Sequence, residues 1–168
     1  MKSLYLMRHG KSDWLVESGT RDEDRPLNPR GRKAASAAGS FLARTGQRPD
    51  LVWCSHAVRA RDTARLASEQ GKFSSDPIER PELYLADPHA VIELVRTAPA
   101  SAERLLLVGH EPTCSSLLSL LTGARTRYTT ATLSRIDFDV SSWEDVAELT
   151  GHLGLMIDGR AMTGLADD

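Results

Sequence analysis

Two histidines in this chain come directly after apolar runs, and each has a glycine beside it. Arg8, His9 and Gly10 follow one run, and His110 follows another. If both runs are strands of a parallel sheet, both histidines lie at the edge where such sheets bind ligands. A neutral imidazole can attack an electrophile or carry a proton, and the Arg8 guanidinium matches the oxygens of a phosphate. Gly10 permits a sharp turn and a close approach of a ligand to the backbone.

Three further residues fit a phosphate pocket at the same edge. Arg59 lies in the first turn of a predicted helix, where free backbone N–H groups attract anions. Lys11 and Ser12 follow His9 closely enough to donate to a phosphate, with simple exposure to solvent as the alternative. Arginines beside the histidines would repel a divalent ion, and no carboxylates stand at zinc-type spacing. The pattern therefore favours phosphate over metal, and no cofactor is expected.

Proton donation to a leaving group requires a nearby acid, and three carboxylates are candidates. Asp87 precedes a proline and is typical of a helix N-cap. Glu82 has no such structural role, and Glu111 directly follows His110. The sequence leaves the choice between Glu82 and Glu111 open.

The other histidines and the tryptophans are not expected to take part in the chemistry. The remaining histidines have no partner pattern and are expected to be peripheral, and the tryptophans are expected to pack, although Trp14 is near the mouth of the pocket. These residues are His56, His89, His152, Trp14, Trp53 and Trp143.

Strand-like and helix-like segments alternate along the chain, which is typical of an α/β domain with a mostly parallel sheet. We expect one domain over residues 1–168, with a short disordered C-terminal tail at 164–168. Asn28 and Pro29 mark the start of the first helix. Strands are predicted at residues 3–7, 50–54, 104–108, 132–138 and 152–157, and helices after Asn28, Cys54, Asp87 and Glu111.

Composition excludes several classes of protein. A hydrophobic fraction of 40% and a formal net charge of -2 argue against disorder and against nucleic-acid binding. No apolar run is long enough to span a membrane. Cys54 and Cys114 stand far apart, so we expect reduced thiols and a cytoplasmic protein.

The chain resembles the histidine phosphatase superfamily, which has the phosphoglycerate mutase-like fold, and within it the SixA-type phosphohistidine phosphatases. The resemblance extends from Leu4 to about Phe138, and its motifs in this order are highly specific. They are Leu-Met-Arg-His-Gly-Lys-Ser-Asp-Trp at 6–14, Asp-Arg-Pro-Leu-Asn-Pro-Arg-Gly at 24–31, the segment 55–64, Leu-Tyr at 83–84 and Val-Gly-His at 108–110.

The resemblance implies a three-layer α/β/α sandwich and a metal-independent phosphatase. His9 would be the nucleophile that forms a phosphohistidine intermediate, with Arg8, Arg59 and His110 completing the phosphate pocket. The leaving-group acid stays open between Glu82 and Glu111, and members of the SixA-type branch often lack an obvious acid.

The short chain has little room for the lid that many members place over small substrates. An open pocket suits a phosphorylated protein or a broad range of phosphoesters. The lack of a clear acid favours phosphohistidine, because its imidazole leaves with little help from an acid. The alternatives are a broad-specificity small-molecule phosphomonoesterase or a binding module without activity. A monomer or weak dimer is expected.

Overall fold

One mixed sheet of six strands organises the chain, whose computed structural model describes residues 1–167. The strand order is β3-β2-β4-β1-β5-β6. The first four strands in this order pair in parallel, and β5 and β6 join antiparallel. The mostly parallel sheet predicted from the sequence is confirmed. The strands span Lys2–Arg8 (β1), Leu51–Cys54 (β2), Ile78–Glu79 (β3), Arg104–Gly109 (β4), Leu133–Phe138 (β5) and Gly151–Ile157 (β6).

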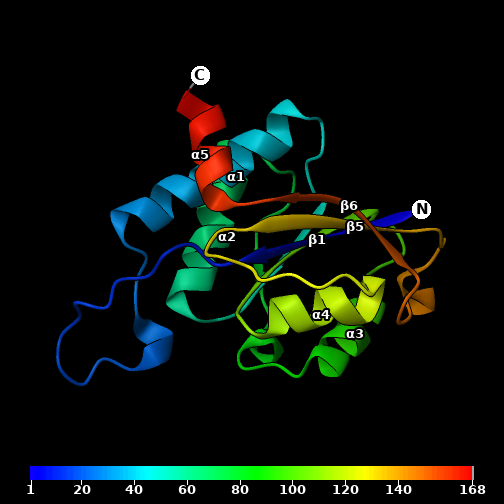
Figure 1. Ribbon diagram of the computed structural model, residues 1–168, viewed down its shortest axis with the longest axis horizontal. Helices are drawn as coiled ribbons and strands as arrows, with labels where there is room; N and C mark the ends of the chain where they lie inside the picture. The colour runs from blue at the N-terminus through cyan, green and yellow to red at the C-terminus, as the bar shows by residue number, and fades with distance from the viewer. Residues whose placement is uncertain (168) are drawn as a thin grey trace.

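Helices cover both faces of the sheet, which gives the three layers that the resemblance implied. Successive strand side chains point to opposite faces, so Leu4 and Leu6 pack in one core while Tyr5 and Met7 pack in the other. Figure 1 shows α1 and α5 above the sheet and α3 and α4 below it, and α2 shares its core with α1 and α5. The helices span Pro29–Arg44 (α1), Val58–Gly71 (α2), Pro88–Arg96 (α3), Thr113–Thr122 (α4) and Gly159–Asp167 (α5).

Two of the helices begin with the caps predicted from the sequence. The Asn28 side chain accepts a hydrogen bond from the Gly31 N–H at 2.8 Å, and Asp87 accepts one from the His89 N–H at 2.9 Å. Each cap satisfies an N–H group that a helix start leaves without a partner. Within residues 1–167, no helix combines the length and the apolar character needed to cross a membrane.

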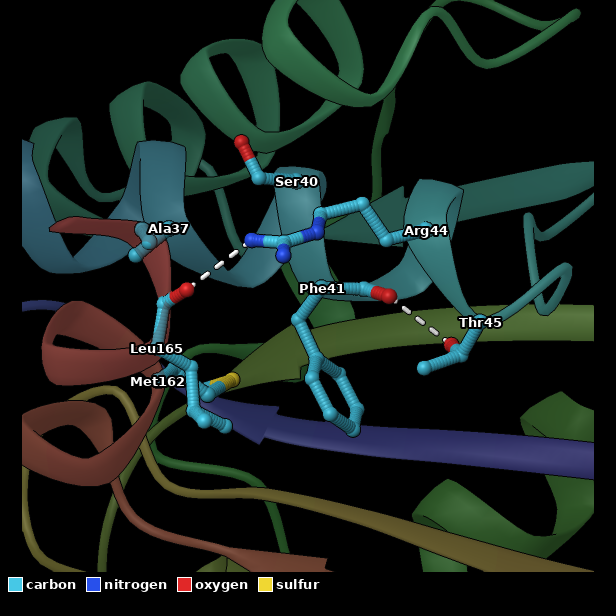
Figure 2. Close-up of a pocket in the computed structure, with 8 residues that line it drawn as sticks. Ala37, Ser40, Phe41, Arg44, Thr45, Met162 and Leu165 are labelled. Carbon is cyan, nitrogen blue, oxygen red and sulfur yellow. Dashed lines mark hydrogen bonds between the residues drawn. The ribbon is translucent and has the colours of Figure 1, made fainter. Parts of the chain in front are cut away.

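The end of the chain corrects one expectation. Residues 164–167, predicted to be a disordered tail, continue α5, and Asp168 lies outside the described residues. Met162 is buried in the core, and the Arg44 guanidinium donates to the carbonyl oxygen of Leu165 at 2.9 Å. Figure 2 shows Met162 and Leu165 beside Phe41 of α1. These contacts with α1 stabilise the last turns, and the sequence of the tail alone does not indicate them.

The parallel strands place their carboxyl ends along one edge of the sheet. In Figure 1, β1 runs from the N-terminus on the right toward the left, where the blue segment between β1 and α1 projects. That segment contains the short helix Asp22–Asp24, and a second short helix, Pro81–Leu83, follows β3.

Candidate active site

Neighbouring strands bring together three residues that are far apart in the sequence. β4 lies between β1 and β2, with Arg8 opposite Gly109 and Cys54 opposite Val108. His9, Ser55 and His110 each follow the last residue of one of these strands. The His9 and His110 ring centroids are 5.2 Å apart. The predicted meeting of the two histidines at the sheet edge is therefore confirmed.

Close backbone packing fixes the loop that follows His9. A Cβ on Gly10 would lie 2.7 Å from the Gly31 carbonyl oxygen, and a Cβ on Gly31 would lie 2.1 Å from the Lys11 carbonyl oxygen. Neither position has room for a side chain, so only glycines allow the start of α1 to reach this loop. The Gly10 N–H also donates to the Thr63 hydroxyl at 2.9 Å. Gly10 thus holds the loop in place through its backbone and is not among the residues that line the cavity.

Two hydrogen bonds determine the tautomer of His9. Its Nδ1 lies 2.7 Å from the carbonyl oxygen of Gly10. Because a carbonyl oxygen only accepts, Nδ1 carries the proton. Its Nε2 lies 3.3 Å from Nε of Arg59, which only donates. The free electron pair of the His9 ring is therefore on Nε2.

Burial keeps both histidines neutral. It lowers the pKa of His9 from 6.5 to about 3, against the opposing hydrogen bond to Gly10 and with the help of nearby positive charge. Burial also lowers the pKa of His110 to about 4, and the positive charge of Arg59 lowers it further. At neutral pH, His9 is an uncharged base, the form in which an imidazole acts as a nucleophile.

His110 is fixed by one nitrogen. Its Nε2 lies 2.8 Å from the Ser55 hydroxyl. Its Nδ1 is buried and has no hydrogen-bond partner among the described residues. A buried polar atom without a partner is costly, so this nitrogen indicates a site that is completed by a bound polar group.

Arg8 and Arg59 supply positive charge beside the histidines. The Arg8 guanidinium donates to the Tyr128 carbonyl oxygen at 2.9 Å, and its Nε is buried without a partner among the described residues. Arg59 is buried at the start of α2. Two guanidinium groups and two neutral imidazoles form a setting that suits the oxygens of a phosphate.

Sequence reasoning missed Asp22, which holds Arg59 in place. Arg59 donates through Nη1 to the Asp22 carbonyl oxygen at 2.6 Å and through Nη2 to its carboxylate at 2.9 Å. The carboxylate also accepts from Tyr84 at 2.8 Å and from Arg25 at 3.1 Å. Partial burial raises the pKa of Asp22, but the hydrogen bonds from Tyr84 and Arg59 outweigh it and hold the pKa at about 2. Asp22 begins the short acidic helix Asp22–Asp24, which is too short to show a periodic pattern, and no sequence signal connects it to Arg59.

These groups surround a cavity of about 340 Å³. Lys11 lies on its wall, and so does Ser12, whose hydroxyl accepts from Arg25 at 2.9 Å. Among the described residues, no cluster of His, Cys, Asp or Glu side chains is arranged to hold a metal ion. The lining consists of Arg8, His9, Lys11, Ser12, Trp14, Asp22, Arg25, Arg59, Leu85, His110, Glu111 and Thr130.

Comparisons with known proteins agree with this geometry. The sequence model of the histidine phosphatase superfamily (branch 1) matches residues 4–84. The putative phosphohistidine phosphatase SixA from Nakamurella multipartitia is 31% identical, with a TM-score of 0.77, and the match covers 93% of this chain and 95% of that one. The chain belongs to the histidine phosphatase superfamily. The resemblance to its SixA-like branch, drawn from the sequence motifs, is confirmed, and the chain is a phosphatase.

Two other proteins extend this similarity. An uncharacterized protein of Mycobacterium tuberculosis is 43% identical over 115 residues, which are 68% of this chain and 69% of that protein. A protein histidine phosphatase SixA complexed with tungstate has the same fold at 20% identity, with a TM-score of 0.82 and coverage of 95% of this chain and 99% of that chain.

This histidine phosphatase brings only one of the two candidate acids to the cavity. Glu82 is exposed, and its carboxylate lies 3.4 Å from Arg80, outside the lining residues. Glu111 lines the cavity, but both of its carboxylate oxygens accept from the Ser115 hydroxyl at 2.8 Å. Glu82 follows a two-residue strand at the edge of the sheet, and the sequence does not indicate in which direction the chain turns there.

Trp14 at the mouth of this phosphatase and His56 outside the cavity lining make contacts that the sequence does not indicate. Trp14 does not pack in the core. It is exposed, with the Arg25 guanidinium 3.6 Å from its ring centroid. His56 is not isolated, because it lies 3.2 Å from the Glu23 carboxylate and edge-on to Tyr84. Tyr84 in turn lies edge-on to His110, with their ring centroids 5.5 Å apart.

Proposed function

We propose that this phosphatase hydrolyses phosphohistidine on proteins, without a metal, through a phosphoryl group carried by His9. The observation that supports this most directly is the tautomer of His9. Its Nδ1–H is held by the Gly10 carbonyl oxygen, and its Nε2 electron pair points to Arg59 in the cavity. A neutral, oriented imidazole beside cationic groups is the arrangement that nucleophilic attack on phosphorus requires.

The reaction takes two steps. In the first, His9 Nε2 attacks the phosphorus of the substrate while the substrate imidazole takes up a proton from water. The bond from phosphorus to that imidazole breaks, and the imidazole leaves as a neutral ring. The His9 ring becomes positive, and the hydrogen bond from Nδ1 to the Gly10 carbonyl oxygen stabilises that charge. In the second step, a water oxygen attacks the phosphorus and the bond to Nε2 breaks. Inorganic phosphate departs with both protons of that water, and His9 is neutral again.

Cationic groups replace a metal in this scheme. Negative charge spreads over the equatorial oxygens during phosphoryl transfer, and fixed cations stabilise it. Arg8 offers its buried, unpartnered Nε, and His110 offers Nδ1 when the Ser55 hydroxyl donates to Nε2. Arg59 contributes its charge while Asp22 holds its two Nη atoms. Tungstate, a tetrahedral oxyanion, is bound in the structurally similar SixA, which agrees with a phosphate site in this fold.

Little acid catalysis is available, and this favours a phosphohistidine substrate. Glu111 is the remaining candidate for a general acid, although both of its oxygens accept from Ser115. General acid catalysis contributes about 10²–10⁴-fold, and an alkyl ester depends on it heavily. An imidazole that takes up a proton from water leaves without such help.

The mouth of the cavity supports a protein substrate. Trp14, Leu15 and Leu85 are 70%, 94% and 80% exposed, and the first and third line the cavity. Exposed apolar side chains gathered at one place indicate a site of protein contact. Leu85 has a φ of 52°, which is uncommon for a residue with a branched side chain. Such strained residues cluster at functional sites.

Turnover of two substrates tests this proposal. We expect the protein to release phosphate from a phosphohistidine-containing protein with a higher kcat/KM than from para-nitrophenyl phosphate, and EDTA to leave both rates unchanged. His9→Ala and the similarly sized His9→Gln should lose turnover of both. Rapid quenching with the wild type should give a phosphoryl group on His9 that is labile in acid and stable in alkali.

The other outcomes contradict separate parts of the proposal. A preference for the aryl ester would make the protein a broad-specificity phosphomonoesterase, and inhibition by EDTA would contradict metal independence. No turnover of either substrate, with phosphate-ligand binding retained in His9→Ala, would indicate a binding module. His152→Gln, on the exposed part of β6, serves as the control for a histidine outside the site.

A further inference from the structure

A second cavity adjoins the active site and has no part in the proposed chemistry. It measures about 530 Å³ and lies between the loop after His9 and the starts of α1 and α5. Lys11 and Thr130 line both cavities, so the two share a wall. A molecule bound at His9 can therefore extend into the second cavity.

The lining of this cavity is basic, although the whole chain has a formal net charge of -2. Lys11, Arg30 and Arg160 are exposed on it and come from three separate segments. None of the three forms an ion pair or a side-chain hydrogen bond within the part of the chain that the structure describes. Lys33 also lines the cavity.

One carboxylate is found among the described residues of this lining, and it has a structural role. Asp158 accepts a hydrogen bond from the Ala161 N–H at 2.8 Å and so caps α5. The cationic side chains lie beside the starts of two helices, and helix starts carry partial positive charge. Side chains and backbone therefore both favour negative charge in this cavity.

We propose that the second cavity binds acidic side chains that flank the phosphorylated histidine of a protein substrate. The proposal builds on the proposed function, because it extends the same substrate from the catalytic cavity across the shared wall. At 530 Å³ the cavity exceeds the catalytic one, at 340 Å³, and a single phosphate would leave most of it unfilled. The cationic side chains are also spread over three segments, which suits several carboxylates on one chain better than one compact anion. Together with the apolar residues at the mouth, the cavity would select acidic phosphoproteins.

Binding of inert peptides tests this separately from catalysis. Two peptides carry the same phosphohistidine analogue with a carbon–phosphorus bond, one flanked on both sides by glutamates and the other by glutamines. Calorimetry with the wild type should show about tenfold tighter binding of the acidic peptide, equivalent to about 1.4 kcal/mol from a few exposed ion pairs. Arg30→Gln combined with Arg160→Gln should remove this preference and leave the affinity for the neutral peptide unchanged. Lys11 is left intact because it also lines the catalytic cavity.

The control carries the same change of charge on α2 and at the residue that follows its last turn, away from the cavity. Arg65→Gln combined with Lys72→Gln should keep the tenfold preference. Equal binding of the two peptides by the wild type, or a preference that persists in the Arg30 and Arg160 variant, would overturn the inference. Binding to phosphatidylserine vesicles without a preference between the peptides would overturn it in favour of a lipid surface.

Turnover measured in parallel separates the two proposals. If phosphohistidine is hydrolysed but the acidic flanks have no effect, only the role of the second cavity is wrong. If the acidic peptide binds more tightly but no phosphohistidine is hydrolysed, the cavity assignment stands and the proposed function is wrong.

Discussion

The interior and the mouth of the active site are built in different ways. In the interior, His9 and His110 directly follow adjacent parallel strands and are buried, with backbone or short side chains holding one nitrogen of each ring. At the mouth, Trp14 and Leu85 come from loops and are exposed. The strands and the hydrogen bonds to each ring thus fix the positions of the two histidines, whereas the loops determine which substrates reach them.

This difference separates the chemistry from the choice of substrate. Changes in the interior should affect every substrate equally, because any phosphoryl group must meet the same charges and the same nucleophile. Changes at the mouth should affect a protein substrate and leave a small ester unaffected. Comparing two substrates for each variant therefore tests whether the two regions are independent.

Apart from loss of the nucleophile His9 itself, the largest effect is expected from Arg59→Gln in the interior. Loss of this buried cation beside His9 Nε2 should lower kcat/KM by about 10²–10³-fold for both para-nitrophenyl phosphate and a phosphohistidine protein, as removal of one fixed donor to a transition state does elsewhere. Lys11→Gln, an exposed cation on the same cavity, is the matched control and should cost less than about tenfold. Equal losses of kcat/KM in the two variants would mean that a buried cation and an exposed one contribute equally to catalysis.

The next effect concerns the backbone contact that supports the interior. In Gly31→Ala, the new methyl group would meet the Lys11 carbonyl oxygen at 2.1 Å, so the loop after His9 must shift. We expect a loss of about 1–3 kcal/mol in the free energy of unfolding, measured in urea, together with a lower kcat. Gly164→Ala in α5 is the control, because a Cβ there meets nothing within 4 Å. It should be neutral or gain about 0.5–1 kcal/mol. Full stability and activity of Gly31→Ala would show that this contact is dispensable.

The sequence predicted the interior well for a physical reason. Each of its residues lies directly after an apolar run or at a helix start, and parallel strands align their carboxyl ends, so the order along the chain already implies a meeting in space. His9 and His110 are found by this argument, and Arg59 is found by its place in the first turn of α2.

The sequence could not predict the contacts at the mouth, because loops have no periodic pattern of apolar residues. Asp22 contacts Arg59 only through the path of the segment that projects between β1 and α1. Glu82, one of the two candidate acids, lies outside the cavity, because the chain after β3 directs its side chain toward Arg80. The helical C-terminus was missed for a related reason, since its stability comes from packing on α1 rather than from its own residues.

Low pH should weaken the fold through the interior histidines. In the unfolded chain they titrate near 6.5, whereas in the folded protein burial lowers the pKa of His9 to about 3 and that of His110 to about 4. Between about pH 6.5 and pH 4 the unfolded state therefore binds more protons, and the free energy of unfolding falls as the pH falls. The slope is about 1.4 kcal/mol per pH unit for each histidine.

Urea unfolding between pH 4.5 and pH 7.5 measures this slope. His9→Gln and His110→Gln should each reduce it, while His152→Gln on the exposed part of β6 should not. A slope that is unchanged in both interior variants would mean that these rings accept protons in the folded state as readily as in the unfolded one, and burial would then not be what keeps His9 neutral.

The smallest effect is expected at the mouth, from Trp14→Ala. The Trp14 ring is exposed and stacks on Arg25 rather than on the core, so its removal should leave the fold and the turnover of para-nitrophenyl phosphate within about twofold of the wild type. For a phosphohistidine protein, kcat/KM should fall by about 3- to 10-fold, in the range of an aromatic contact at an interface. Leu149→Ala removes an exposed apolar side chain outside the cavity lining and is the control. A loss of the same size for both substrates would place Trp14 with the catalytic interior, and the separation of chemistry from substrate choice would fail at this residue.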